Sequence, residues 1–381
     1  MKKLKLSKIP SAPLDAEILL SSVLRKKREY LLAHPGDAIT LSQSQKYQAL
    51  ISRRVKGEPA AYLTHHKEFY GLDFYVNKNT LIPRPESELI IEEVKKIAAS
   101  PIIIDVGTGS GCLAITLAYS IPQAAVYATD LSPKALSIAR RNARLHKINP
   151  VREPRSLTQS RNLFLTGLKS AGFSNGIKIK FLRGNLLSPL PSCVWQLPSK
   201  KIIIANLPYL SEKYRKDIRD TSLRYEPREA LWGGKDGLKY YRQLFQQISK
   251  IIQSRAIDLT ILIEINPEQT IRIKKVIKQY LPCAEIKIKK DLAGLNRIAV
   301  IQMDRRKPAK MRSCCESATQ VSVRLSPLQD LRPDLQNNTL SACVRKRRTA
   351  ARRGRVLLQK LLPPPLVSPC LSSLQSLNDL N

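Results

Sequence analysis

Two groups of apolar residues recur at helical spacing between residues 12 and 57, as on the buried face of amphipathic helices. Pro35 and Gly36 separate the two groups and predict a break between helices. Residues 58–82 predict a hinge and a short hairpin that turns at Gly71. A further helix is expected around residues 90–94, after two stiffening prolines. The apolar positions behind these predictions are Leu14, Ile18, Leu19, Val23, Leu24, Tyr47, Leu50, Ile51, Val55, Phe69, Tyr70, Leu72, Phe74, Val76, Ile90, Ile91 and Val94.

From residue 101 onward, short β-branched runs alternate with helical patterns. Residues 102–104 are consecutive isoleucines, which is typical of a strand buried on both faces of a parallel sheet. This alternation predicts an α/β fold with a parallel sheet covered by helices. Two later apolar stretches suit a hairpin that closes the sheet edge. The predicted strands are 102–104, 125–128, 179–183, 201–205, 259–265, 284–288 and 298–301, and the predicted helices are 112–119, 132–146, 238–253 and 270–279.

These patterns predict a helical domain with a hinge hairpin over residues 1–80 and an α/β domain over residues 81–303. Residues 148–178 are polar and basic with weak periodicity, so we expect a surface insertion there. Residues 304–381 are basic, contain a run of three prolines and end in a Ser/Leu-rich stretch. Such a composition predicts a largely disordered tail.

The chain carries a large excess of positive charge. The 381 residues include 65 Lys and Arg against 30 Asp and Glu, which gives a formal net charge of +35. This balance argues against an ordinary acidic enzyme and favours contact with nucleic acid, a ribonucleoprotein such as the ribosome, an anionic membrane or an acidic protein. The 7 cysteines form no C-x-x-C pair and the 4 histidines do not cluster, so we expect a reducing, cytoplasmic setting and no metal site. No apolar run reaches membrane-spanning length and no secretory signal is expected.

A glycine-rich stretch lies between the predicted strand at 102–104 and the helix at 112–119. Glycines allow a tight turn and a close approach of the backbone to a ligand. The G-x-G-x-G spacing is shorter than the dinucleotide-binding pattern, so it suits a ligand part without phosphate, such as the amino-acid part of S-adenosylmethionine. A tight strand–helix turn without any ligand is the alternative. The stretch comprises Asp105, Val106, Gly107, Thr108, Gly109, Ser110 and Gly111.

Asp130 ends the next predicted strand, where a carboxylate can accept hydrogen bonds from both hydroxyls of a ribose. The alternative is a helix cap. Ser132 and Pro133 already provide good capping chemistry, which leaves Asp130 free for a ligand.

Asn206, Leu207, Pro208 and Tyr209 follow the predicted strand at 201–205. At the carboxyl edge of a parallel sheet they would present an amide oxygen, a backbone carbonyl and an aromatic face. Two acceptors that grip the N–H groups of a planar nitrogen would orient it for attack on a methyl group. The alternative is a strand ended by proline with a packing tyrosine.

In this order, these three motifs resemble those of class I S-adenosylmethionine-dependent methyltransferases that act on planar nitrogen, with a Rossmann-like sheet. Residues 57–63, 81–88 and 225–231 resemble further segments of the release-factor glutamine methyltransferases, the PrmC or HemK family. The helical N-terminal part also fits that family. The resemblance covers roughly residues 12–303.

The resemblance implies methylation of the side-chain amide of the glutamine in the Gly-Gly-Gln tripeptide of class 1 peptide chain release factors, with S-adenosylmethionine as cofactor. It implies that residues 107–111 pass the methionine end, Asp130 holds the ribose, and Asn185 and Leu186 flank the adenine. It further implies that Asn206 and the Leu207 carbonyl hold the glutamine amide, and that Asn206 also contacts the cofactor. The same resemblance gives Pro208 the role of shaping the turn, Tyr209 that of packing on the substrate, and Arg84 and Glu88 that of helping to grip the release factor.

Two positions depart from the family pattern. Leu207 stands where proline is usual and Asn185 where aspartate is common. The Leu207 carbonyl would still accept a hydrogen bond, and Asn185 would accept one without charge. We therefore expect an active enzyme. Because the sequence shows no interface motif, we expect a monomer.

Two alternatives stay open. One is a methyltransferase that acts on a ribosomal-protein glutamine or on an adenine amino group. The other is a non-catalytic RNA- or ribosome-binding protein. Among single residues, Glu264 could line the cleft or make a structural hydrogen bond, and Cys112 is expected to pack as a small core residue.

Overall fold

The computed structural model describes residues 4, 7, 9–97, 100–148, 178–216, 221–255 and 257–303. The predicted tail at 304–381 lies outside these residues, as does the predicted insertion except for its end residues 148 and 178.

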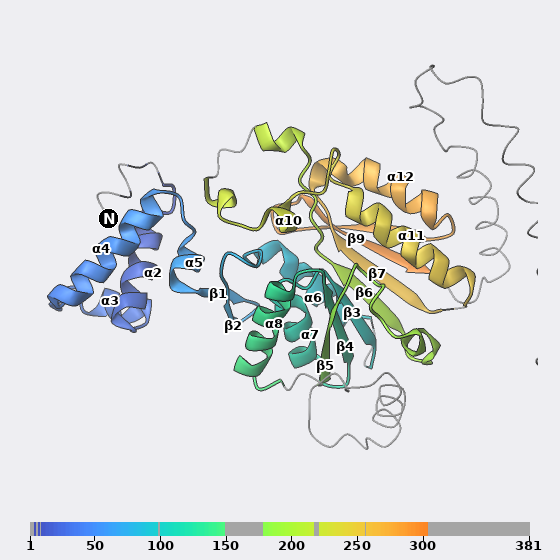
Figure 1. The fold of residues 1–381 in the computed structure, drawn as a ribbon, viewed down its shortest axis with the longest axis horizontal. Helices are drawn as coiled ribbons and strands as arrows, with labels where there is room; N and C mark the ends of the chain where they lie inside the picture. Colours follow the sequence, from blue (N-terminus) through green and yellow to red (C-terminus); the bar gives the residue numbers. More distant parts are fainter. Residues whose placement is uncertain are drawn as a thin grey trace, which may run out of the picture. The chain divides into compact units, whose positions relative to one another are not determined.

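A seven-stranded sheet runs through the α/β part of the chain in the order β5-β4-β3-β6-β7-β9-β8 (Figure 1). The first five strands in this order are parallel, and β9 runs antiparallel to both β7 and β8. The predicted parallel sheet and its closing edge hairpin are therefore confirmed. The strands are β3 (Ile102–Val106), β4 (Ala125–Asp130), β5 (Lys178–Arg183), β6 (Lys201–Ala205), β7 (Leu259–Glu264), β8 (Glu285–Lys290) and β9 (Asn296–Met303).

Helices cover both faces of this sheet because successive strand residues point to opposite sides. In β3, Ile103 belongs to the core on one face, whereas Ile102 and Ile104 belong to the core on the other. Side chains of α6, α7 and α8 fill the first core, and those of α11 and α12 fill the second. Figure 1 shows the ribbons of these helices beside the sheet. The helices are α6 (Glu88–Lys95), α7 (Cys112–Ser120), α8 (Pro133–Leu145), α11 (Lys239–Gln253) and α12 (Thr270–Tyr280), with the shorter α10 (Arg228–Leu231).

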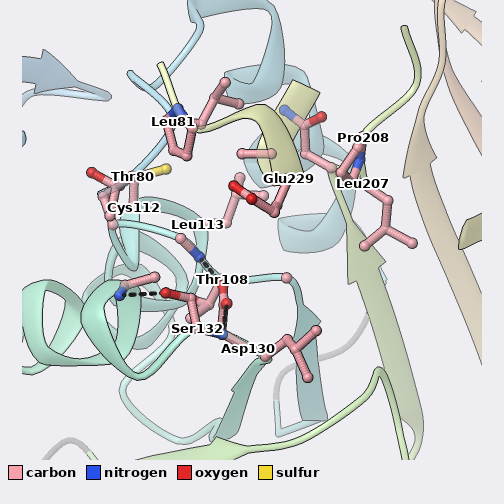
Figure 2. Close-up of a pocket in the computed structure, with 18 of the residues that line it drawn as sticks. Thr80, Leu81, Thr108, Cys112, Leu113, Asp130, Ser132, Leu207, Pro208 and Glu229 are labelled. Atoms are coloured by element: carbon pink, nitrogen blue, oxygen red, sulfur yellow. Dashed lines mark hydrogen bonds between the residues drawn. The ribbon is translucent and has the colours of Figure 1, made fainter. Parts of the chain in front are cut away.

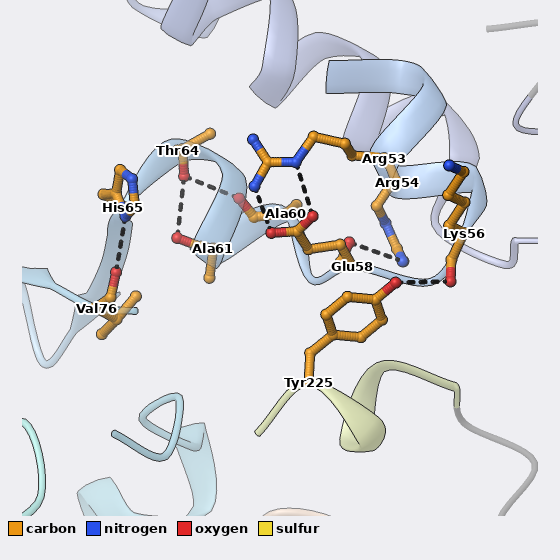
Figure 3. A network of polar contacts seen from close by, with 10 residues as sticks. All are labelled: Arg53, Arg54, Lys56, Glu58, Ala60, Ala61, Thr64, His65, Val76 and Tyr225. Carbon is orange, nitrogen blue, oxygen red and sulfur yellow. Dashed lines mark hydrogen bonds and ion pairs between the residues drawn. The ribbon is translucent and has the colours of Figure 1, made fainter. Parts of the chain in front are cut away.

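In the described N-terminal residues, α2, α4 and α5 surround a small core of their own, to which Leu19, Ile51 and Leu63 contribute. Figure 3 shows the end of α4 and the segment that follows it. Arg53 donates from Nε and Nη2 to the Glu58 carboxylate, at 2.8 and 2.6 Å. The predicted hinge contains one helix, α5, that is too short for a helical period to show in the sequence. The helices are α2 (Ala12–Leu24), α3 (Arg28–Ala33), α4 (Leu41–Val55) and α5 (Ala60–Thr64).

The predicted hairpin forms from β1 (His66–Phe69) and β2 (Leu72–Tyr75). Its turn has positive φ at both central residues, Tyr70 and Gly71, as a tight two-residue hairpin turn requires. Asn142 on α8 fixes this hairpin: its side chain accepts from Tyr75 N at 2.8 Å and donates to Tyr75 O at 3.0 Å. The same amide donates to Ser110 O at 2.9 Å, so it also ties the hairpin to the glycine-rich loop.

Candidate active site

A cavity of about 390 Å³ lies at the carboxyl edge of β3, β4 and β6. Figure 2 shows Thr80 and Leu81 on one side of it, Leu207 and Pro208 on the other, and Asp130 at the bottom of the view. Most of the site residues predicted from the sequence meet here. Those that line the cavity are Arg84, Gly107, Thr108, Gly109, Ser110, Asp130, Asn185, Leu186, Asn206, Leu207 and Pro208.

Three of the predicted residues do not line this cavity. Gly111, the N-cap of α7, packs behind the loop, where an added Cβ would lie 3.1 Å from the Ala139 Cβ on α8. The Glu88 carboxylate accepts a hydrogen bond from Tyr70 N at 2.9 Å and therefore fixes the hairpin turn. Tyr209 lines a neighbouring cavity instead.

The glycine-rich loop uses its backbone N–H groups internally. Those of Gly107 and Thr108 both donate to Thr129 O at 2.9 Å, and that of Gly109 donates to Asp130 Oδ2 at 2.9 Å. Donors held in this way cannot cradle a phosphate, which agrees with the ligand expected from the G-x-G-x-G spacing. Gly107 and Gly109 adopt φ of 76° and 56°, a region that favours glycine.

Asp105 lies beneath this loop and is almost fully buried. Its Oδ2 accepts a hydrogen bond from Thr108 Oγ1 at 2.6 Å, whereas no described residue donates to its buried Oδ1. Burial raises the pKa of this carboxyl to about 7, since removal from water disfavours the charged form. A nearby cation would satisfy the unpartnered oxygen and favour ionisation.

Asp130 is held more tightly than the sequence indicated. Its Oδ1 accepts from Ser132 N at 2.8 Å and its Oδ2 from Gly109 N, although Ser132 Oγ also caps α8 by accepting from Ala135 N at 3.2 Å, as predicted. Burial raises the pKa of Asp130, and the backbone donors oppose this shift. Each carboxylate oxygen can accept a second hydrogen bond, so the fixed carboxylate still offers acceptors to the cavity.

The turn after β5 completes this end of the cavity. Gly184 N donates to Asp130 O at 3.0 Å, which joins this turn to the end of β4. Leu186 is buried and has a φ of 54°, a left-handed conformation that is costly for a branched side chain and that often occurs at binding sites. Asn185 is exposed at the cavity.

Close packing fixes the backbone of residues 206–209. A Cβ added at Gly233 would lie 2.4 Å from Pro208 O, and a Cβ added at Gly237 would lie 2.1 Å from Tyr209 O. Gln269 Nε2 donates to Tyr209 O at 2.9 Å. Glycines and one buried amide therefore hold these four residues in place.

A second cavity of about 260 Å³ adjoins the first, and both are lined by Leu81, Arg84, Asn206 and Ala230. Tyr209 lines only the second cavity. Asn206 is therefore one of the four residues beside which two ligands in these cavities would meet.

The sequence reading did not assign a role to Glu226, which joins two distant motifs. Its buried carboxylate pairs with Arg84 and accepts from Ile82 N at 3.0 Å, so it holds residues 82–84 against the segment around 226. In the sequence, both segments resemble segments of the same family, but their spacing along the chain cannot show that they touch. Glu229 also lines the first cavity and was not expected there (Figure 2).

Three other features bear on the kind of site. Cys112 borders the cavity, and burial raises the pKa of its thiol to about 12, which disfavours a reactive thiolate. Within the described ranges, no group of three or more His, Cys, Asp and Glu side chains is placed to hold a metal ion. No helix in the described part of the chain has both the length and the apolar character needed to cross a membrane.

The strand order, the loop after β3 and the carboxylate after β4 define a methyltransferase domain of the Rossmann-like class. Residues 1–64 match the family model of the PrmC N-terminal domain, and residues 89–165 match that of ribosomal protein L11 methyltransferase (PrmA). Release factor glutamine methyltransferase of Koribacter versatilis is 32% identical over 310 residues, which span 79% of this chain and 94% of the relative. The chain belongs to the release factor glutamine methyltransferase family.

A second relative has the same name. Release factor glutamine methyltransferase of Coxiella burnetii is 33% identical over 75% of this chain and 90% of the relative. Among solved structures, a methyltransferase from Pyrococcus furiosus is 15% identical with a TM-score of 0.38, over 61% of this chain and 89% of that one.

Proposed function

We propose that this chain transfers the methyl group of S-adenosylmethionine to the side-chain amide nitrogen of the Gly-Gly-Gln glutamine in class 1 peptide chain release factors. The observation that carries this proposal is the pair of cavities that meet at Asn206. The names of the relatives supply the substrate, and the geometry supplies a place for two ligands side by side.

The residues of the larger cavity fit S-adenosylmethionine. The N–H groups of Gly107, Thr108 and Gly109 already donate to Thr129 and Asp130, so they are not free for a phosphate, and a ligand part without phosphate suits this loop. We assign residues 107–110 to the methionine end, Asp130 to the ribose, and Asn185 and Leu186 to the adenine. Gly111 supports the loop from behind.

When bound, S-adenosylmethionine supplies an electrophilic methyl group. Asn206 Oδ1 and the Leu207 carbonyl accept hydrogen bonds from the substrate amide and so orient its nitrogen toward the shared wall of the cavities. The Leu207 carbonyl is 3.5 Å from the Tyr241 hydroxyl, which donates its proton to Glu264 O, so the carbonyl keeps its capacity to accept. The Leu207 side chain packs on the loop, where an added Cβ at Gly107 would lie 3.0 Å from it.

Pro208 shapes this turn, and Tyr209 packs on the substrate in the second cavity. We assign recognition of the release factor to the helical part, residues 1–80, and to Arg84, which Glu226 holds in place. Residues 81–303 form the methyltransferase domain in this proposal. We further propose a cytoplasmic monomer whose positive surface makes weak contact with nucleic acid or the ribosome.

The names of the relatives do not favour the alternative acceptors, a ribosomal-protein glutamine or an adenine amino group. One experiment separates the three. Methyl transfer from labelled S-adenosylmethionine is measured with purified release factor, its Gln→Ala variant in the Gly-Gly-Gln tripeptide, ribosomal proteins and total RNA. Label in the intact release factor alone supports the proposal, and label in RNA or ribosomal protein alone contradicts it.

The variant Asn206→Ala tests the proposed clamp. Removal of one precisely placed hydrogen-bonding group at a reacting centre typically costs about 10²-fold or more in turnover. We expect that loss in methyl transfer, with cofactor affinity by calorimetry unchanged. Near-normal transfer would remove Asn206 from the mechanism.

A further inference from the structure

The amide of Asn206 is tied at one end to a buried chain of hydrogen bonds. Asn206 Nδ2 donates to Ser87 Oγ at 2.9 Å. The Ser87 hydroxyl donates in turn to Glu264 Oε2. Ser87 and Glu264 are 2% and 1% exposed, so water cannot replace these partners. Three segments therefore meet: the turn before α6, the end of β6 and the end of β7.

These hydrogen bonds permit only one orientation of the Asn206 side-chain amide. A serine hydroxyl has a single proton, and Glu264 accepts it. The Ser87 oxygen is left with lone pairs, which attract the amide nitrogen and repel the amide oxygen. The Oδ1 of Asn206 accepts no hydrogen bond from any described residue, and Asn206 lines both cavities. The oxygen is thus the end left available to a ligand.

Glu264 also holds a second predicted site residue. The Tyr209 hydroxyl donates to its Oε1 at 3.3 Å. Burial raises the pKa of Glu264 to about 7, and Glu86 adds to this rise. The hydrogen bonds from Ser87 and Tyr209 and the charge of Arg297 on β9 oppose it. Cys112 on α7 and Tyr241 on α11 also lie within its electrostatic reach. A charged carboxylate accepts both hydroxyl protons more strongly than a neutral one.

We propose that Ser87 and Glu264 are positioning residues for methyl transfer: ionised Glu264 accepts a hydrogen bond from the Ser87 hydroxyl, and the Ser87 oxygen in turn holds the Asn206 amide with its oxygen toward the substrate nitrogen. The assignment of a substrate partner to this oxygen rests on the proposed function. Protonation of Glu264 weakens the chain, so turnover falls as the pH drops through about 7. Ionised Glu264 is the active form, and turnover is therefore highest on the alkaline side.

The first measurement follows the Glu264–Ser87–Asn206 hydrogen bonds in the absence of substrate. The side-chain amide signal of Asn206 is followed by NMR from pH 5 to 9 (about one unit per step) and is assigned by its loss in Asn206→Ala. We expect it to titrate near pH 7 in the wild type and to be flat in Glu264→Gln. Glu268→Gln, a change at an exposed glutamate four residues beyond the end of β7, should leave the titration unchanged. A wild-type signal that does not move would overturn the proposal.

The second experiment measures kcat and KM for methyl transfer from labelled S-adenosylmethionine to the release factor. Ser87→Ala and Glu264→Gln should each lower kcat by about 10–100-fold, because misorientation of a reacting group has effects of this size. KM and cofactor affinity should stay within about threefold of the wild type, and the decline of kcat below neutral pH should disappear in Glu264→Gln. Ser87→Thr, which keeps the hydroxyl, should restore kcat.

The outcomes separate the two proposals. A normal kcat in Ser87→Ala, or a parallel loss of cofactor affinity and kcat, would overturn the positioning role. A titrating Asn206 amide together with no label in the release factor would keep the chain of hydrogen bonds and remove the proposed substrate.

Discussion

Gly237 meets two separate constraints at the site. Its φ of 77° lies in the left-handed region, and its Cα approaches the backbone of Tyr209 so closely that a Cβ there would lie 2.1 Å from Tyr209 O. Gly294 has almost the same φ, 78°, but an added Cβ would meet nothing within 4 Å. The two glycines therefore separate backbone strain from close packing.

We expect Gly294→Ala to lower the free energy of unfolding by about 1–2 kcal/mol, the cost of a left-handed alanine. Gly237→Ala adds a backbone clash and should cost a further 1–3 kcal/mol, roughly, together with a loss of methyl transfer. Urea denaturation and the labelled assay measure both. Equal losses of stability in the two variants would show that the loop at 237 moves aside without strain.

At the scale of elements, one buried side chain connects the hairpin, α8 and the glycine-rich loop. Asn142 makes three hydrogen bonds, two with Tyr75 and one with Ser110 O, and it is fully buried. Ser110 is itself buried at the ligand cavity. The position of the loop thus depends on a hairpin that lies far from it along the chain.

We expect Asn142→Ala to lower the free energy of unfolding by about 2–4 kcal/mol, because it leaves buried backbone groups without partners. Cofactor affinity should fall as well, since the loop loses its tie to the hairpin. Arg144→Ala, an exposed change on the same helix, should change stability by less than about 0.5 kcal/mol. Urea denaturation and calorimetry test this; unchanged cofactor affinity in Asn142→Ala would show that the loop holds its shape alone.

For the whole molecule, charge acts at longer range than any contact described above. The formal net charge of +35 attracts an acidic partner during encounter but has little effect on groups already bound and shielded from water. Charge should therefore govern how fast substrate arrives rather than how fast bound substrate reacts.

We expect that a rise from about 50 to about 300 mM salt lowers kcat/KM for the release factor several-fold and leaves kcat nearly unchanged. Steady-state methyl transfer at both salt concentrations measures the two constants. Equal effects on kcat and kcat/KM would contradict electrostatic steering.

The sequence by itself determined the α/β class, the strands and the position of the edge hairpin, because burial on both faces imposes β-branched runs and the helices between them keep a regular period. Most of the site residues that it predicted line the larger cavity, since the ends of parallel strands meet at one edge. It placed Glu88 and Gly111 at ligands, whereas their contacts support the hairpin and the packing of α7 on α8.

Only the tertiary structure decided which distant side chains touch. Ser87 and Glu264 are 177 positions apart and Ile82 and Glu226 are 144 apart, so no local period or spacing connects them. Local patterns report whether a residue is buried, but a hydrogen bond between segments depends on how the strands are ordered in the sheet. That order brings the turn before α6 onto the ends of β6 and β7, and so places a buried carboxylate behind the amide that faces both cavities.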